Sequence, residues 1–125
     1  RPNILLITSD QQHWNTLGIT NPEISTPALD KLASQGVVFG RTYCPNPTCT
    51  PTRSSLITGR YPSQHGAWTL GTHLPQSELT IGEVMSEAGY RTALVGKAHF
   101  QALQVRESPA KYVVARSVDE ILASG

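Results

Sequence analysis

The sequence alternates short apolar runs with segments of helical pattern, and this alternation constrains the fold more than any other feature. Residues 4–7 (Ile-Leu-Leu-Ile) form a continuous apolar run that is typical of a fully buried strand. Residues 37–43 and 92–96 are predicted to form two further strands. Strands separated by helices favour parallel βαβ units. The sequence therefore predicts an α/β fold, a parallel-type sheet with helices on both faces.

Each predicted helix begins at a capping residue and most end at a glycine. A Thr-Pro pair places a capping hydroxyl before a proline in the first helical position, and a capping box joins a hydroxyl with a carboxylate three residues later. The stretch 60–79 lacks periodicity and is predicted to be a surface loop. The predicted helices cover 27–35 after Thr26, 51–58 after Thr50, 81–88 after Thr80, and a short tail after the capping box Ser117–Glu120.

The composition indicates a globular chain. Of the 125 residues, 38% are hydrophobic and 15% are charged, which is enough to build one core. The formal net charge of +1 and the lack of a Lys/Arg run give no indication of nucleic-acid binding. No apolar stretch reaches the ~18 residues of a membrane span. No signal peptide is evident, which favours a cytoplasmic location, or a periplasmic or secreted one if a leader was removed.

Reactive side chains follow the predicted strands. Asp10 and Gln11 come after the first strand, and Lys97 and His99 come after the third. The second strand leads through a Pro- and Thr-rich loop to Cys49, at the start of a predicted helix. In open parallel sheets ligands bind outside the carboxyl ends of the strands, so we expect these residues to meet at one edge.

The residue types at this edge favour an anionic substrate and a metal ion. The helix N-terminus beside Cys49 attracts anions, and Arg53 and Lys97 add positive charge. Asp10 and Gln11 offer hard oxygen ligands that suit Ca²⁺ or Mg²⁺. The sequence thus predicts a metal-assisted site for an oxyanion. By contrast, we interpret Cys44 as a small buried hydrophobe and His65 as a structural histidine.

Three blocks of the sequence resemble those of one enzyme family. Residues 49–59 (Cys-Thr-Pro-Thr-Arg-Ser-Ser-Leu-Ile-Thr-Gly) resemble the sulfatase signature C-x-P-[ST]-R and its continuation. Residues 2–11 resemble the family's opening strand and first metal ligands, and residues 87–99 resemble its third block. Their order and spacing over 1–104 resemble the N-terminal part of a formylglycine-dependent sulfatase catalytic domain, of the alkaline-phosphatase-like superfamily. The tail at 105–125 is left unassigned.

The resemblance implies a mechanism. In the family the signature cysteine, here Cys49, is oxidised to Cα-formylglycine by a formylglycine-generating enzyme that reads C-x-P-x-R in the unfolded chain. The aldehyde hydrates, and one hydroxyl, activated by a divalent metal, attacks the sulfur of a sulfate ester. The alcohol leaves, and the second hydroxyl then allows sulfate to be expelled, which is covalent catalysis with an unusual nucleophile.

The resemblance also implies individual roles. Gln11 stands where a second Asp is commoner in the family, and a Gln here also occurs in related phosphonate and phosphate ester hydrolases. This departure keeps a phosphonate monoester or phosphodiester hydrolase as an alternative, and a non-catalytic binding or structural module is a further one. The implied metal ligands are Asp10, Gln11 and the modified Cys49, with Ca²⁺ favoured over Mg²⁺; the implied catalytic residues are Cys49, Arg53 for the hydrate, Lys97 for the sulfate oxygens and His99 for the hydrate or sulfate.

The family's catalytic domain is several times longer than 125 residues, and its second half brings further metal ligands. No residue after His99 resembles them. We therefore expect this chain to be a fragment with little activity when isolated. We also expect an uncovered sheet edge, through which the isolated chain would self-associate.

Overall fold

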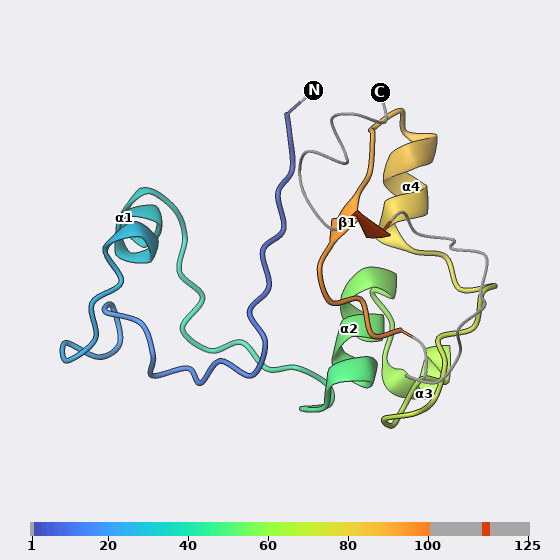
Figure 1. The fold of residues 1–125 in the computed structure, drawn as a ribbon, viewed down its shortest axis with the longest axis horizontal. Helices are drawn as coiled ribbons and strands as arrows, with labels where there is room; N and C mark the ends of the chain where they lie inside the picture. Colours follow the sequence, from blue (N-terminus) through green and yellow to red (C-terminus); the bar gives the residue numbers. More distant parts are fainter. Residues whose placement is uncertain (1, 101–113, 116–125) are drawn as a thin grey trace. The chain divides into compact units, whose positions relative to one another are not determined.

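The computed structural model describes residues 2–100 and 114–115 (Figure 1). The chain divides into two compact units, Arg1–Thr42 and Tyr43–Gly125. The first unit contains helix α1 (Pro27–Gln35). The second contains helices α2 (Cys49–Thr58), α3 (Pro62–His65) and α4 (Ile81–Glu87), and strands β1 (Leu94–Val95) and β2 (Val114–Ala115). The predicted tail helix after Ser117 lies outside the described residues.

Helix α1 forms as predicted, with Pro27 at its start and Gly36 directly after it. Thr26 occupies the N-cap position, but its side chain does not cap the helix backbone. Instead its hydroxyl donates to Asp30 Oδ1 at 2.8 Å and accepts the Gly18 backbone N–H at 2.7 Å. Thr26 therefore ties the preceding loop to the first turn of α1.

The strands predicted at 4–7 and 37–43 are not confirmed. Among the described residues, neither segment is assigned as a strand, and the apolar side chains of residues 4–7 are 63–83% exposed. A strand gains its backbone hydrogen bonds only from a neighbour, and the described part of the first unit offers none. The apolar pattern alone therefore does not create a strand here.

Helix α2 begins earlier than predicted. Its N-cap is Thr48, not Thr50, so Cys49 is the first helical residue and Pro51 the third. Proline is tolerated there because the first N–H groups of a helix have no partner within it. The helix ends as predicted at Gly59, whose φ of +68° lies in the left-handed region.

The segment 60–79 is not simply a surface loop, so that prediction is wrong in part. It contains α3 and two of the buried core residues, Ala67 and Leu74, which form a cluster with Phe100. The Leu74 N–H donates to the Phe100 carbonyl at 2.9 Å and joins the segment to the stretch after β1. Further residues that pack against this core are Ile57, Leu94 and Ala98.

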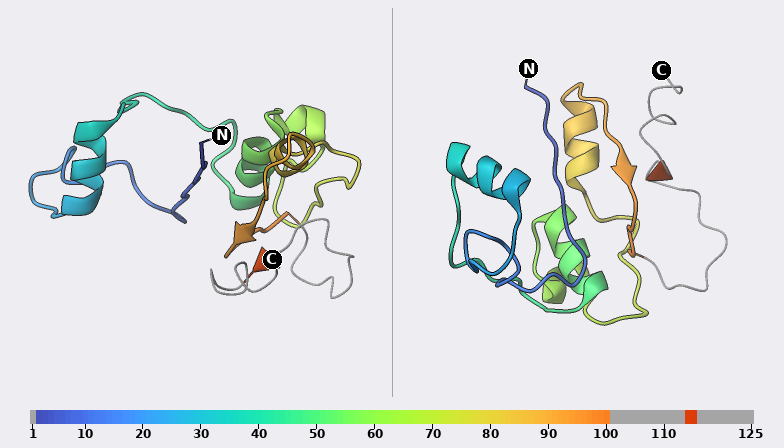
Figure 2. Two further views of the ribbon diagram at one scale, coloured as in Figure 1. Left: turned by 90° about the horizontal axis from the view of Figure 1, so that it is seen from above. Right: turned by 60° about the vertical axis from the view of Figure 1, so that its left-hand side comes forward.

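Helix α4 begins at the predicted capping box. The Thr80 backbone N–H and the Thr80 hydroxyl both donate to Glu83 Oε2, each at 2.9 Å. Helix α2 packs against α3 and against α4 (Figure 2). Every helix among the described residues is too short or too polar to cross a membrane.

Strand β1 covers part of the strand predicted at 92–96. It pairs in parallel with β2, with Leu94 opposite Val114 and Val95 opposite Ala115. Helices α2 to α4 together with this parallel pair agree with the predicted α/β class.

A matched pair of glycine substitutions tests how α2 ends. Gly59→Ala should lower the free energy of unfolding by about 1–2 kcal/mol, because an L-residue is strained at a positive φ. A Cβ at Gly59 would meet no atom within 4 Å, so the effect is purely conformational. Gly82→Ala, inside α4, should instead raise the free energy of unfolding by about 0.5–1 kcal/mol, because alanine loses less conformational entropy in a helix than glycine. Urea unfolding of both variants measures this, and equal changes would contradict the account.

Candidate active site

The loop before α2 fixes the position of Cys49. Asn46 Oδ1 accepts the Thr48 backbone N–H at 2.9 Å and the Thr48 hydroxyl at 2.6 Å. The Thr52 hydroxyl, on the first turn of α2, donates to the Asn46 carbonyl. Cys49 is half-buried at the start of this turn, and the N-terminus of a helix carries a partial positive charge.

Three of the residues predicted for the site come together around this helix end. Lys97 Nζ donates to Cys49 Sγ at 3.7 Å, although the two residues are 48 positions apart. Arg53 Nη1, one turn along α2 from Cys49, donates to the Lys97 carbonyl at 2.7 Å. Lys97 and the N-terminus of α2 therefore lie at the sulfur atom, and Arg53 supports Lys97 from the same helix. This arrangement suits an anion.

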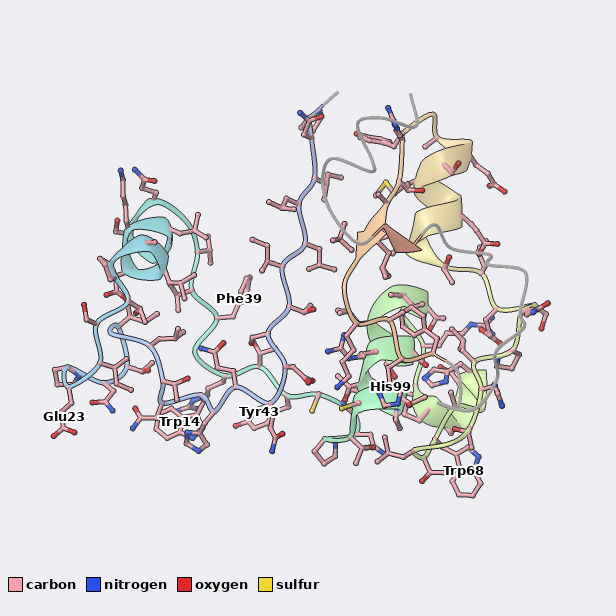
Figure 3. All side chains as sticks on the ribbon, in the orientation of Figure 1. Trp14, Glu23, Phe39, Tyr43, Trp68 and His99 are labelled. Carbon is pink, nitrogen blue, oxygen red and sulfur yellow. The ribbon has the colours of Figure 1, made fainter. Side chains whose placement is uncertain are left out.

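His99 lies two residues after Lys97 and is half-buried (Figure 3). Its Nδ1 atom is buried without a hydrogen-bond partner, and its φ of +54° is rare for a residue other than glycine. Strained backbone and unsatisfied buried polar atoms both tend to occur at functional sites. These features favour a binding role for His99, although a structural role agrees with its partial burial.

Asp10 and Gln11 belong to the first unit, whereas Cys49, Arg53, Lys97 and His99 belong to the second. Both side chains are exposed and adjacent in the chain, and Gln11 has a φ of +54°. Their carboxylate and amide oxygens are the donors that Ca²⁺ and Mg²⁺ prefer, so the donor chemistry fits a hard divalent cation. Among the described residues, no group of three or more His, Cys, Asp or Glu forms a metal-binding cluster.

A buried pair beneath the site was not predicted from the sequence. His65, at the end of α3, is 1% exposed, and its Nε2 lies 3.0 Å from the Ser55 hydroxyl of α2. Its Nδ1 accepts the Ala67 N–H at 3.1 Å, so Nε2 carries the proton of the neutral ring and donates to Ser55. This pair joins α3 to the helix that carries Cys49, which agrees with a structural role for His65. No motif pairs Ser55 with His65, so no pattern along the chain could have predicted the contact.

The expectation for Cys44 is wrong, because its side chain is exposed. It lies in the loop before α2, outside the core formed by Ala67, Leu74 and Phe100. The loop has no apolar periodicity, so the residues around Cys44 do not form a face that packs against the core. The general tendency of cysteine to be buried therefore does not apply at this position.

The buried imidazole generates a pH-dependent prediction. Burial lowers the pKa of His65 below its ordinary 6.5, and the nearby Glu78 carboxylate opposes that shift only in part. The unfolded chain therefore binds the proton more readily. The stability due to neutral His65 is complete above pH 6.5 and is lost as the pH falls below 6.5 through the lowered folded pKa.

An NMR titration of the His65 ring should show a midpoint below 6.5. His65→Gln should remove this part of the pH dependence of unfolding, whereas the same change at exposed His73 controls for the loss of an imidazole. A His65 midpoint at or above 6.5 would contradict the neutral, buried pair.

Comparison with known proteins places the chain in a family. A family model described as Sulfatase matches residues 2–115. An N-acetylgalactosamine-6-sulfatase from Homo sapiens is 38% identical over 112 residues, in an alignment that covers 78% of this chain and 22% of that protein. An ulvan-active sulfatase from Formosa agariphila is 41% identical over 100 residues, covering 79% of this chain and 20% of that protein.

Arylsulfatase G from Rattus norvegicus is 42% identical over 105 residues, covering 79% of this chain and 20% of that protein. The chain thus spans about a fifth of the length of the curated relatives it matches. No solved structure matches the chain significantly. The family match covers nearly all of the sequence and includes every residue predicted for the site, so the chain belongs to the sulfatase family.

Proposed function

We propose that this chain carries the Cys49 portion of the active site of a sulfuric ester hydrolase of the arylsulfatase type. The observation that carries the proposal is the approach of Lys97 Nζ to within 3.7 Å of Cys49 Sγ at the first residue of α2. Membership of the sulfatase family and the sulfatase names of the relatives support the reaction class.

The charges around Cys49 support a role in binding the sulfate group. A sulfate ester is an anion, and negative charge builds up on the leaving oxygen as the ester bond breaks. Lys97 would bind sulfate oxygens directly beside the atom that replaces Cys49 Sγ. Donors fixed in advance at such a position stabilise the transition state without having to reorganise. Arg53 holds the Lys97 backbone in place through the hydrogen bond from its Nη1, and its guanidinium adds a second positive charge on α2.

We propose that Cys49 is converted to Cα-formylglycine by a formylglycine-generating enzyme. The hydrated aldehyde carries two hydroxyls: one attacks the sulfate ester, and the second permits release of sulfate. A serine-like side chain has one hydroxyl and lacks this second group. His99 would hydrogen-bond through its unpartnered Nδ1 to the hydrate or to the sulfate. Asp10, Gln11 and the residue derived from Cys49 would hold one divalent cation, with Ca²⁺ favoured. The oxygen donors of Asp10 and Gln11 supply part of the roughly 6–8 ligands that Ca²⁺ takes.

We further propose that the α/β fold is of the alkaline-phosphatase-like kind, a parallel sheet with helices on both faces. The parallel pairing of β1 with β2 supports this arrangement. The exposed apolar side chains of residues 4–7 and 37–39 would become buried in such a sheet. The same exposed surface supports self-association of the isolated chain, because unpaired apolar segments recruit partners.

One residue favours a second candidate within the same superfamily. Gln11 is a neutral ligand where a second carboxylate is commoner, so the metal site would hold one negative charge fewer. A less negative site would suit a phosphonate monoester or a phosphodiester as well as a sulfate ester. A non-catalytic binding module is less well supported, because Lys97 contacts both Cys49 and Arg53, which suits the proposed reaction.

Kinetics of the full-length parent protein, of which this chain is a part, test this proposal. Hydrolysis of an aryl sulfate should exceed hydrolysis of a phenyl phosphonate. Lys97→Ala should lower kcat/KM for the aryl sulfate by about 10²–10³-fold, because it removes one charge-stabilising donor. Lys31→Ala, an exposed lysine on α1, should stay within about twofold of wild type.

A higher rate on the phosphonate would favour the phosphonate hydrolase instead. If wild type turned over neither compound, the binding module would be favoured. An unchanged kcat/KM in Lys97→Ala would contradict the role assigned to Lys97.

A further inference from the structure

We propose that Asn46 is a positioning residue for the group at Cys49, acting through Thr48 and Thr52. This inference rests on the proposed function, because it concerns the geometry of the same site. Asn46 lies three residues before Cys49, outside the C-x-P-x-R motif. It is half-buried between two prolines, Pro45 and Pro47, which restrict the backbone on either side.

Asn46 binds the first turn of α2 from both its side chain and its backbone. Its Oδ1 accepts two hydrogen bonds from Thr48, one from the backbone N–H at 2.9 Å and one from the hydroxyl at 2.6 Å. Its carbonyl accepts the hydroxyl of Thr52. Thr48 and Thr52 lie on either side of Cys49 in the sequence, so Asn46 holds the turn before and after the reacting position.

Asn46 also anchors this turn to a distant segment. Its Nδ2 donates to the Trp68 carbonyl at 3.4 Å, across 22 residues of sequence. The same segment holds α2 a second time through the pair of His65 and Ser55. Two separate contacts therefore fix α2 against the stretch from α3 to Trp68, while Arg53 fixes it to Lys97.

This geometry has a consequence for catalysis. A displacement of about 1 Å at a reacting group can lower the rate on the order of 10²-fold even when the substituted residue never touches the substrate. Loss of the Asn46 side chain would free Thr48 and release the anchor to Trp68, so Cys49 would move relative to Lys97. The site would then still bind the sulfate ester, but its nucleophile would be less well aligned.

The chain supplies a matched control at Asn21. Asn21 Oδ1 accepts the Glu23 backbone N–H at 3.0 Å, and its Nδ2 donates to the Asn15 carbonyl at 3.4 Å. These are the same two kinds of hydrogen bond that Asn46 makes to Thr48 and Trp68. Asn21 lies in the other unit, on no element that carries Cys49, so Asn21→Ala removes comparable contacts without affecting the α2 turn.

The first experiment measures steady-state kinetics of the full-length parent protein on an aryl sulfate, together with the mass of the Cys49 peptide. Asn46→Ala should lower kcat by about 10–10²-fold and change KM much less. Asn46→Asp keeps the acceptor for Thr48 but loses the donor to Trp68, so it should recover only part of kcat. Asn21→Ala should leave both constants unchanged. Cys49 conversion should be equal in all variants, because the modifying enzyme reads the unfolded chain.

The second experiment needs no activity. In the unconverted chain with Cys44→Ser, Cys49 is the one remaining thiol, and iodoacetamide reports how often its half-buried turn opens. Asn46→Ala should speed alkylation by about threefold or more, whereas Asn21→Ala should not.

An unchanged kcat with normal conversion, or equal alkylation rates in all variants, would overturn the role of Asn46. If wild type proved inactive on aryl sulfates while Asn46→Ala still accelerated alkylation, the positioning role would stand and the proposed reaction would fail. A loss of kcat that Asn46→Asp did not recover, accompanied by the same loss of stability, would assign Asn46 to folding alone.

Discussion

The hydrogen bond from Arg53 Nη1 to the Lys97 carbonyl joins two parts of the chain that are 44 residues apart. On one side it holds α2, which carries Cys49 at its first position; on the other it holds the segment that follows β1. Through this contact Lys97 Nζ reaches Cys49 Sγ, and the remaining features of the site follow from it. The cation, the reactive position and the helix N-terminus meet because the Arg53 guanidinium binds a backbone carbonyl.

Further contacts hold Cys49 and Lys97 in position. Asn46 fixes the start of α2, and the buried pair of His65 and Ser55 fixes its middle against α3. Beneath them the core of Ala67, Leu74 and Phe100 joins the segment after α3 to the segment after β1. The residues that hold the site in position are thus mostly outside the signature motif. This distribution is expected of a site that depends on alignment more than on any single contact.

The sequence predicted those features that depend on neighbouring residues. Helices α1, α2 and α4 were predicted from local signals: Pro27 at the start of α1, the capping box of α4, and a glycine directly after α1 and α2. The predicted start of α2 at Thr50 was wrong because Asn46 stabilises an earlier N-cap at Thr48, and that contact has no periodic signature. The strands at 4–7 and 37–43 were not confirmed, because a strand depends on distant partners that no local pattern supplies.

The candidate site also divides into residues that the sequence predicts and contacts that only the fold reveals. The rule that ligands bind at the carboxyl ends of strands singled out Lys97 and His99, and the signature motif singled out Cys49 and Arg53; the structure brings Lys97 and Arg53 to the Cys49 helix end. The roles of Asp10 and Gln11 as metal ligands remain predictions from residue type. Asn46 and the pairing of Ser55 with His65 escaped prediction because these hydrogen bonds connect segments whose proximity appears only in the folded chain.

The central claim is that Cys49 is the precursor of the reacting group. Mass spectrometry of the Cys49 peptide from the protein made in its native host tests it most directly. Conversion of the side-chain CH₂SH to an aldehyde should lower the peptide mass by ~18 Da relative to unmodified cysteine. A peptide that carries only the intact thiol would contradict the account.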